Sequence, residues 1–131
     1  MPFSSLGLPT YITKGLAAYD YETPYPIQEK AIPAILEKRD VLGIAPTGSG
    51  KTASYVLPIL CNLMGNMEGE NRHVNVLVLV PTRELAGQVA DVFRSFSTNL
   101  PESVRTVSVF GGVSINPQMK SILGVNVLVA T

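Results

Sequence analysis

A glycine-rich segment between an apolar run and a helical pattern restricts the possible folds of this chain more than any other feature. The apolar residues 41–45 lead into Pro-Thr-Gly-Ser-Gly at 46–50, and apolar residues recur at helical spacing from Lys51 onward. We therefore expect a strand, a glycine loop and a helix in that order. Such a loop turns successive backbone N–H groups toward one point, which favours a bound phosphate chain.

Strand and helix patterns alternate through the rest of the chain. Residues 74–80 are dense in Val and Leu, which is typical of a strand buried on both faces, and further strands are expected at 104–110 and 125–129. A helical pattern at 85–96 joins the first two of these strands, and a short helix that begins at 116–117 precedes the last. The alternation predicts an α/β fold with right-handed crossovers, a parallel sheet and a ligand site at the carboxyl ends of the strands.

The segment before the glycine loop is helical in pattern. Its apolar residues predict two helices separated by a turn at 20–26. Pro26 suits the first position of the second helix, whereas Pro33 lies inside that helix and is expected to remove a backbone hydrogen bond or to bend it. We therefore divide the chain into a helical segment, 1–39, and an α/β part, 40–131, of the same structural domain.

Length and composition limit the chain to one globular unit. Its 131 residues are 46% hydrophobic and 15% charged, which allows one core and not two domains. Ten Lys and Arg balance ten Asp and Glu, so any binding to nucleic acid or to a membrane must be local. The single cysteine, Cys61, excludes an internal disulfide. No apolar run approaches the roughly 20 residues of a membrane-spanning helix, and the start of the chain has no secretory pattern. We expect a cytoplasmic protein with no membrane contact.

The glycine loop supplies the groups that a nucleotide phosphate needs. Glycines let the backbone approach the phosphate oxygens, Lys51 would place a positive charge at the β- and γ-phosphates, and the Thr52 hydroxyl would bind Mg²⁺. The candidate nucleotide residues are Ala45, Pro46, Thr47, Gly48, Ser49, Gly50, Lys51 and Thr52. Lys51 and Thr52 are also the catalytic candidates. The general pattern has glycine at the position of Ala45, and the alternative interpretation is an ordinary glycine turn.

An aromatic residue and an amide upstream of the loop have the chemistry to recognise a base. Gln28 can offer one acceptor and one donor to the N6 and N7 edge of adenine, while Tyr21 can stack on the ring. Guanine would invert the donor at that edge. The alternative is that Gln28 is an exposed helix residue and that Tyr21 is a packing residue.

The order of these motifs resembles that of the DEAD-box ATP-dependent RNA helicases of superfamily 2, and the resemblance covers the whole chain. Phe3, Tyr21 and the Pro-Ile-Gln triplet 26–28 are similar to the adenine-reading Q motif of that family. Residues 45–52 are similar to its A-x-T-G-x-G-K-T loop, in which alanine takes the first position. The family usually has Gly and Thr where this chain has Asp20 and Tyr25. The resemblance implies that Phe3, Tyr21 and Gln28 contribute to an ATP site.

Two further segments resemble the RNA-contacting motifs of the same family. Residues 81–86, Pro-Thr-Arg-Glu-Leu-Ala, are similar to its motif Ia, the double glycine 111–112 to its double-glycine motif, and the last residues to the run into motif Ib. From the residues alone, Thr82 is a suitable N-cap and Arg83 a suitable phosphate partner, while an ordinary strand-to-helix turn and a loop are the alternatives. The RNA-binding candidates are Pro81, Thr82, Arg83, Glu84, Gly111, Gly112 and Thr131.

The resemblance implies a parallel-sheet RecA-like P-loop NTPase domain, truncated before the Walker B strand. It implies ATP and Mg²⁺ as cofactors, RNA held through its backbone without sequence preference, and a second RecA-like domain of the same protein as partner. The complete enzyme would couple ATP binding and hydrolysis to RNA unwinding or RNA-protein remodelling. This chain alone has no Asp-Glu-Ala-Asp motif and is expected to be inactive, and its open strand edges are expected to favour self-association. A DNA-directed superfamily 2 helicase and a non-catalytic nucleotide- or partner-binding chain are the alternatives.

Overall fold

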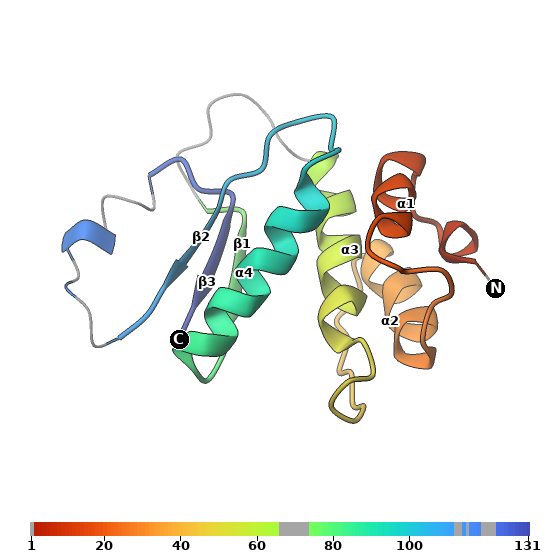
Figure 1. The fold of residues 1–131 in the computed structure, drawn as a ribbon, viewed down its shortest axis with the longest axis horizontal. Coiled ribbons are helices and arrows are strands. Elements are labelled where there is room, and N and C mark those ends of the chain that lie inside the picture. The colour runs from red at the N-terminus through yellow and green to blue at the C-terminus, as the bar shows by residue number, and fades with distance from the viewer. Residues whose placement is uncertain (1, 66–73, 112–113, 115, 119–122) are drawn as a thin grey trace.

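The chain folds into a small parallel sheet covered on one side by helices. The computed structural model describes residues 2–65, 74–111, 114, 116–118 and 123–131. Its helices are η1 (Phe3–Leu6), α1 (Thr10–Ala17), α2 (Pro26–Leu36), α3 (Lys51–Met64) and α4 (Arg83–Ser97), and its strands are β1 (Val76–Leu79), β2 (Thr106–Val109) and β3 (Val127–Ala130). Figure 1 shows the sheet on one side, α4 and α3 beside it, and α1 and α2 on the far side of α3. The predicted α/β class is confirmed.

The three strands are parallel and follow the order β1-β3-β2. In this register Val127 of β3 lies opposite Val76 of β1 and Thr106 of β2. Parallel strands require connections that cross over the sheet. α4 connects β1 to β2 in the chain, and it packs against β2 and β3. The predicted parallel sheet is confirmed, although each strand is shorter than its sequence pattern indicated.

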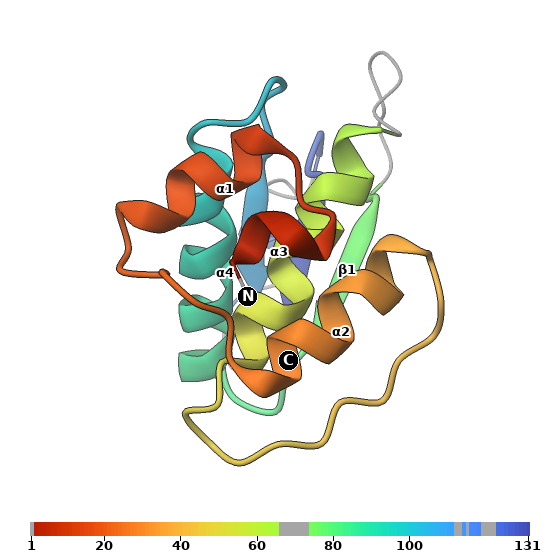
Figure 2. The same cartoon turned by 90° about the vertical axis from the view of Figure 1, so that its right-hand side faces the viewer.

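The prediction of a strand at residues 41–45 is wrong for this structure. These residues form no strand, and Val41, Leu42 and Ile44 are 43%, 86% and 84% exposed. A strand requires a neighbour that supplies hydrogen-bond partners, and the described sheet contains only β1, β2 and β3. Figure 2 shows the link from α2 to α3 as a wide loop apart from the sheet. An apolar run can indicate a strand without supplying the strand that pairs with it.

The prediction that strand 74–80 is buried on both faces is also wrong. Val76 and Val78 of β1 pack against the core, whereas Leu77 and Leu79 are 59% and 72% exposed. Side chains alternate between the two faces of a strand, and in the described structure α3 and α4 cover only one face of this sheet. Because β1 consists of Val and Leu alone, its sequence does not alternate between apolar and polar residues and does not indicate which face is exposed.

The helical predictions before and after the glycine loop are confirmed. α2 begins at Pro26 and contains Pro33, and α3 begins at Lys51. The core between helices and sheet is formed by buried side chains that include Ile32, Leu57, Leu60, Phe93, Val127 and Val129. Cys61 is partly buried beside this core, and burial raises the pKa of its thiol. Among the described residues no helix is both long and apolar enough to cross a membrane.

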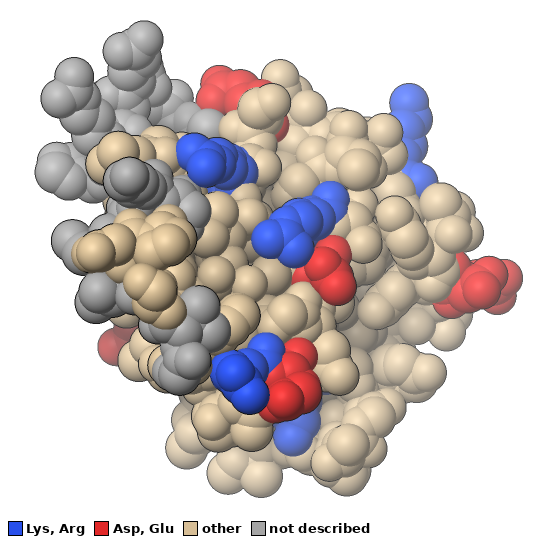
Figure 3. Space-filling view, turned by 60° about the vertical axis from the view of Figure 1, so that its left-hand side comes forward, with Lys and Arg blue, Asp and Glu red and all other residues tan. Residues whose placement is uncertain are grey.

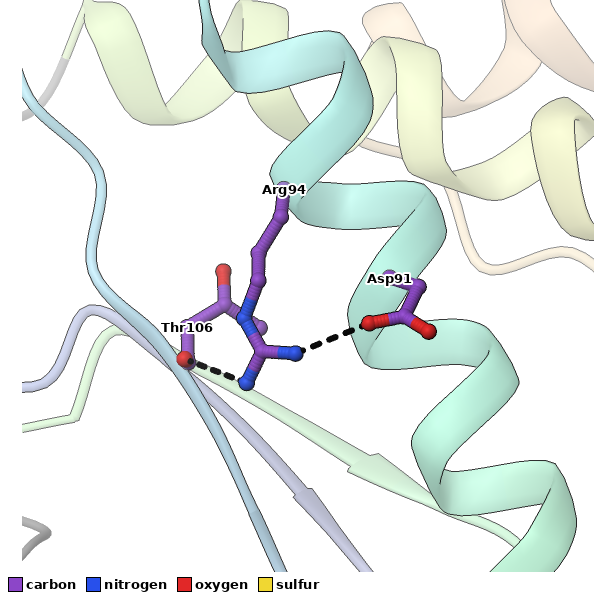
Figure 4. Close-up of polar contacts among 3 residues, drawn as sticks. All are labelled: Asp91, Arg94 and Thr106. Atoms are coloured by element: carbon purple, nitrogen blue, oxygen red, sulfur yellow. Dashed lines mark hydrogen bonds and ion pairs between the residues drawn. The ribbon is translucent and has the colours of Figure 1, made fainter.

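An arginine fastens α4 to the sheet. The Arg94 guanidinium donates to the backbone oxygen of Thr106 at 3.1 Å and to the carboxylate of Asp91 at 3.0 Å (Figure 4). Asp91 lies one turn back on the same helix and is largely exposed, so this ion pair contributes little. The bond to Thr106, where β2 begins, joins two elements that are separated in the sequence.

We expect Arg94→Ala to destabilise the fold more than Asp91→Ala does. Arg94→Ala removes the bond to the part-buried Thr106 carbonyl, which predicts a loss of about 1–1.5 kcal/mol in the free energy of unfolding. Asp91→Ala removes only an exposed ion pair, which predicts a loss under about 0.5 kcal/mol. Urea unfolding followed by circular dichroism measures both. Equal losses would show that the bond from helix to strand adds nothing.

Candidate functional site

The glycine loop runs directly into the start of α3. Gly48 and Gly50 have φ of +81° and +85°, a left-handed conformation that side chains other than glycine rarely adopt. The Ser49 N–H donates to the Pro46 carbonyl at 3.2 Å, which closes a turn. Because α3 begins at Lys51, its first N–H groups have no partner within the helix and carry the positive end of the helix dipole. The loop therefore presents N–H donors at one point.

The side chains of the loop fit a phosphate group. The Ser49 hydroxyl is buried and, within the described part of the chain, has no hydrogen-bond partner. A Cβ placed on Gly48 would meet no atom within 4 Å, so the space above the loop is open. Lys51 is exposed and free to turn toward it. An unused hydroxyl, an exposed ammonium and a helix N-terminus are together suited to an anion.

Thr52 carries the hydroxyl of this loop that is predicted to bind Mg²⁺. It is partly buried on the first turn of α3, next to Tyr55. Burial raises the pKa of the Tyr55 hydroxyl, and a hydrogen bond with Thr52 acts in the opposite direction. Among the described residues no three His, Cys, Asp or Glu side chains gather around a possible metal position. Thr52 fits Mg²⁺ as a single protein ligand, with the other oxygens coming from phosphate and water.

Gln28 connects the upstream helix to the glycine loop. Its side chain is 0% exposed, so the interpretation of Gln28 as an exposed helix residue is wrong. Its Oε1 accepts from the Tyr25 N–H at 2.9 Å, and its Nε2 donates to the Gly50 carbonyl at 3.2 Å. The amide therefore holds the start of α2 against the loop. The reading of an adenine edge by Gln28 stays a prediction.

The aromatic residues of the N-terminal segment form a packed row. Phe3 is buried, and its ring meets that of Tyr21 edge-on with centroids 6.1 Å apart. Tyr21 in turn meets Phe96 of α4 edge-on at 5.5 Å. Tyr21 also lines the pocket beside the glycine loop, whereas Phe3 does not. The Tyr21 ring is therefore in contact with Phe3 and Phe96 while it borders the pocket.

A pocket of about 980 Å³ brings the two segments together. From the loop it is lined by Thr47, Gly48, Gly50, Lys51 and Thr52. Four of the five tyrosines of the chain also line it, namely Tyr19, Tyr21, Tyr25 and Tyr55. Of the nucleotide candidates, Phe3, Gln28, Ala45, Pro46 and Ser49 lie outside its lining. Sequence reasoning did not name Tyr19, Tyr25 or Tyr55 as site residues. The one sequence signal for any of them was that Tyr25 stands where the family usually has Thr.

The RNA-binding candidates lie at the carboxyl end of the sheet. Beyond β1 the Val80 N–H donates to Ala130, and the Gly111 N–H donates to the Thr131 hydroxyl at 3.3 Å. The Thr82 hydroxyl accepts from the Leu85 N–H at 3.1 Å, so the prediction that Thr82 caps α4 is confirmed. Pro81, Thr82, Arg83, Glu84, Gly111 and Thr131 are all exposed, and Gly112 lies outside the described residues. One edge of the sheet thus brings together segments far apart in the sequence.

Charges on the sheet side of the molecule are mixed. Figure 3 shows Lys and Arg side chains spread over this face, with Asp and Glu side chains among them. A formal net charge of zero agrees with this distribution. Contact with a polyanion at this face would therefore depend on individual groups and on helix termini.

Comparison of the sequence with known proteins identifies helicases among its relatives. The sequence pattern described as DEAD/DEAH box helicase matches residues 25–131. The chain is 42% identical over 130 residues to an ATP-dependent RNA helicase DeaD of Haemophilus influenzae and 44% identical over 120 residues to that of Escherichia coli K12. It aligns over 98% and 92% of its own length but spans only 20% and 18% of these relatives.

Solved structures agree with the sequence comparison. A DEAD box protein from Methanococcus jannaschii superposes on 100% of the chain with a TM-score of 0.86 at 35% identity. The RNA-helicase Prp28 from Chaetomium thermophilum, bound to ADP, covers 99% of the chain with a TM-score of 0.85 at 37% identity. The chain covers 34% and 32% of these two proteins.

Proposed function

The chain belongs to the DEAD/DEAH box helicase family, and from this premise we propose that it is the ATP-binding, N-terminal part of the first RecA-like domain of an ATP-dependent RNA helicase. Residues 1–39 form the helical Q-motif segment, and residues 40–131 form part of the nucleotide-binding domain. The complete protein would couple ATP binding and hydrolysis to the unwinding of RNA or the remodelling of RNA-protein complexes, in the cytoplasm. A second RecA-like domain of the same protein would close over the nucleotide.

The observation that supports this most is the contact between Gln28 and the glycine loop. A buried amide that joins the Q-motif helix to the Gly50 carbonyl places base-recognising and phosphate-binding groups around one pocket. In this pocket Lys51 holds phosphate oxygens and Tyr21 contacts the adenine. Ser49 and Gln28 lie behind the lining of the pocket, and we propose that the Ser49 hydroxyl contacts a phosphate and the Gln28 amide the adenine edge once the nucleotide is bound. Thr52 holds Mg²⁺, which when bound neutralises charge on the phosphates.

RNA is proposed to bind at the carboxyl edge of the sheet. The start of α4, capped by Thr82, directs N–H groups away from the sheet, and Arg83 beside it can pair with a phosphate. Gly111 leaves room for a sugar next to Thr131. The proposed RNA contacts are Pro81, Thr82, Arg83, Glu84, Gly111, Gly112 and Thr131. Because these groups face phosphates and sugars, binding is independent of base sequence.

We expect the chain to bind ADP more tightly than GDP by about tenfold or more, because the Tyr21 and Gln28 side chains suit adenine. Titration with fluorescent analogues of both nucleotides measures this. Lys51→Ala should weaken both by about 10- to 100-fold, since a hydrogen bond to a charged group contributes about 1.5–3 kcal/mol. Equal affinity for ADP and GDP would argue against adenine recognition. Equal affinity of Lys51→Ala and wild type would argue against the phosphate site.

ATP turnover by the chain alone is expected to be negligible. Hydrolysis requires a carboxylate to hold the metal and position water, and an arginine to neutralise the transferring phosphate. The Asp-Glu-Ala-Asp sequence that supplies the carboxylates in this family does not occur in the 131 residues. A phosphate-release assay with and without RNA checks this, and RNA-stimulated turnover by the chain would contradict it.

A further inference from the structure

Tyr25 occupies a fixed position at the junction of the two segments that form the pocket. It is the residue immediately before α2, and its N–H donates to the buried Gln28 amide, which in turn donates to Gly50. The backbone of Tyr25 is therefore tied to the glycine loop through one side chain. A threonine at this position could cap α2 with its own hydroxyl. Tyr25 carries instead a large aromatic ring.

The ring of Tyr25 packs on the glycine loop and remains open to the pocket. A Cβ built on Gly50 would lie 2.9 Å from the Tyr25 Cδ2 atom, so the ring edge is in contact with the Gly50 backbone. Tyr25 is nevertheless 55% exposed and lines the same pocket as Lys51 and Thr52. An aromatic surface thus lies next to the predicted phosphate site.

Tyr25 differs from Tyr21 in how much of its ring is available. Tyr21 is partly buried and meets both Phe3 and Phe96 edge-on. In the described part of the chain the Tyr25 ring packs on no other aromatic ring. An exposed, pre-positioned aromatic ring provides contact area to a ligand at a small cost in conformational entropy.

We propose that Tyr25 is a specificity-determining residue of the nucleotide pocket, and that its ring contacts the nucleoside of a bound adenine nucleotide as a second aromatic surface beside Tyr21. This rests on the proposed function. The ring packs on the loop that receives the phosphates, so a nucleoside attached to those phosphates passes beside it. Contact with an aromatic ring favours a nucleoside and adds nothing for a phosphate chain alone.

The test compares three variants of Tyr25 with two probes, ADP and inorganic pyrophosphate, by isothermal titration of the full chain. Tyr25→Phe keeps the ring and should bind ADP within about twofold of wild type. Tyr25→Leu and Tyr25→Thr should weaken ADP binding by about 2- to 12-fold, the range given by an aromatic contact of about 0.5–1.5 kcal/mol. Pyrophosphate affinity should not change, because it contains no nucleoside.

The outcomes separate this proposal from the proposed function. If Tyr25→Leu and Tyr25→Thr bind ADP as wild type does while Lys51→Ala loses it, the role of Tyr25 is overturned and the phosphate site stands. If Tyr25→Leu weakens ADP and pyrophosphate equally, Tyr25 only supports the loop, and the nucleoside contact is overturned. If wild type binds neither probe, both proposals fail. Circular dichroism of each variant identifies any loss of folded structure, and whichever of Tyr25→Leu and Tyr25→Thr remains folded then decides the comparison.

Discussion

Replacement of Gly50 by alanine is expected to destabilise the chain by about 2–5 kcal/mol and to weaken ADP binding at least about tenfold. Gly50 has φ of +85°, where an alanine costs about 1–2 kcal/mol. The added Cβ would also clash with the Gln28 Nε2 and lie 2.9 Å from the Tyr25 ring. Gln28 is fully buried and held by two hydrogen bonds, so it cannot move aside without breaking them. Such overpacking typically costs a further 1–3 kcal/mol.

Gly48→Ala is the matched control for this prediction. Gly48 has nearly the same φ, +81°, but a Cβ there meets no atom within 4 Å. Gly48→Ala should therefore lose only about 1–2 kcal/mol, the cost of the left-handed conformation. Urea unfolding gives both losses, and titration with ADP gives both affinities. If the two variants were equally stable, contact with Gln28 and Tyr25 would have no part in the requirement for glycine.

Local sequence patterns predicted the helices of this fold well. The apolar spacing and Pro26 identified α2, and Thr82 identified the start of α4. A helix satisfies its backbone hydrogen bonds within itself, so the information needed to form it is close in the sequence. Residues 41–45 show the opposite case, because their apolar character indicates a strand while the pairing depends on a distant segment.

The candidate site was predicted in part for the same reason. The glycine loop is one contiguous segment, and its turn and helix start follow from its own residues. The burial of Gln28 depends on Gly50, 22 residues further along the chain. No local pattern predicts that contact, and residue type alone favoured an exposed glutamine. Tyr25 was similarly visible in the sequence only as an unusual residue, and its contact with the loop appears only in three dimensions.

Gln28→Met is expected to destabilise the chain by about 2–4 kcal/mol, although methionine has a similar size and shape. The substitution leaves the Tyr25 N–H without its partner. It also removes one of the two donors to the Gly50 carbonyl, which keeps the Ser54 N–H, and a lost hydrogen bond costs about 0.5–1.5 kcal/mol. A part-buried polar group without a partner costs about 1–3 kcal/mol. Gln88→Met, on an exposed position of α4, is the control and should change stability by less than about 0.5 kcal/mol. Equal losses at the two positions would contradict the structural role of the Gln28 amide.

A double substitution tests whether Gln28 and Gly50 act on one another directly. Gln28→Ala shortens the side chain that an alanine at position 50 would strike, so it should relieve part of the clash in Gly50→Ala. The double variant should be more stable than the sum of the two single losses predicts, by about 1–2 kcal/mol, whereas Gln28→Ala combined with Gly48→Ala should be additive. The three single and two double variants are compared by urea unfolding. Additivity in both pairs would mean that the amide and the loop are not coupled. A positive coupling confined to Gly50 would mean that the Gln28 side chain and the Gly50 backbone are in direct contact.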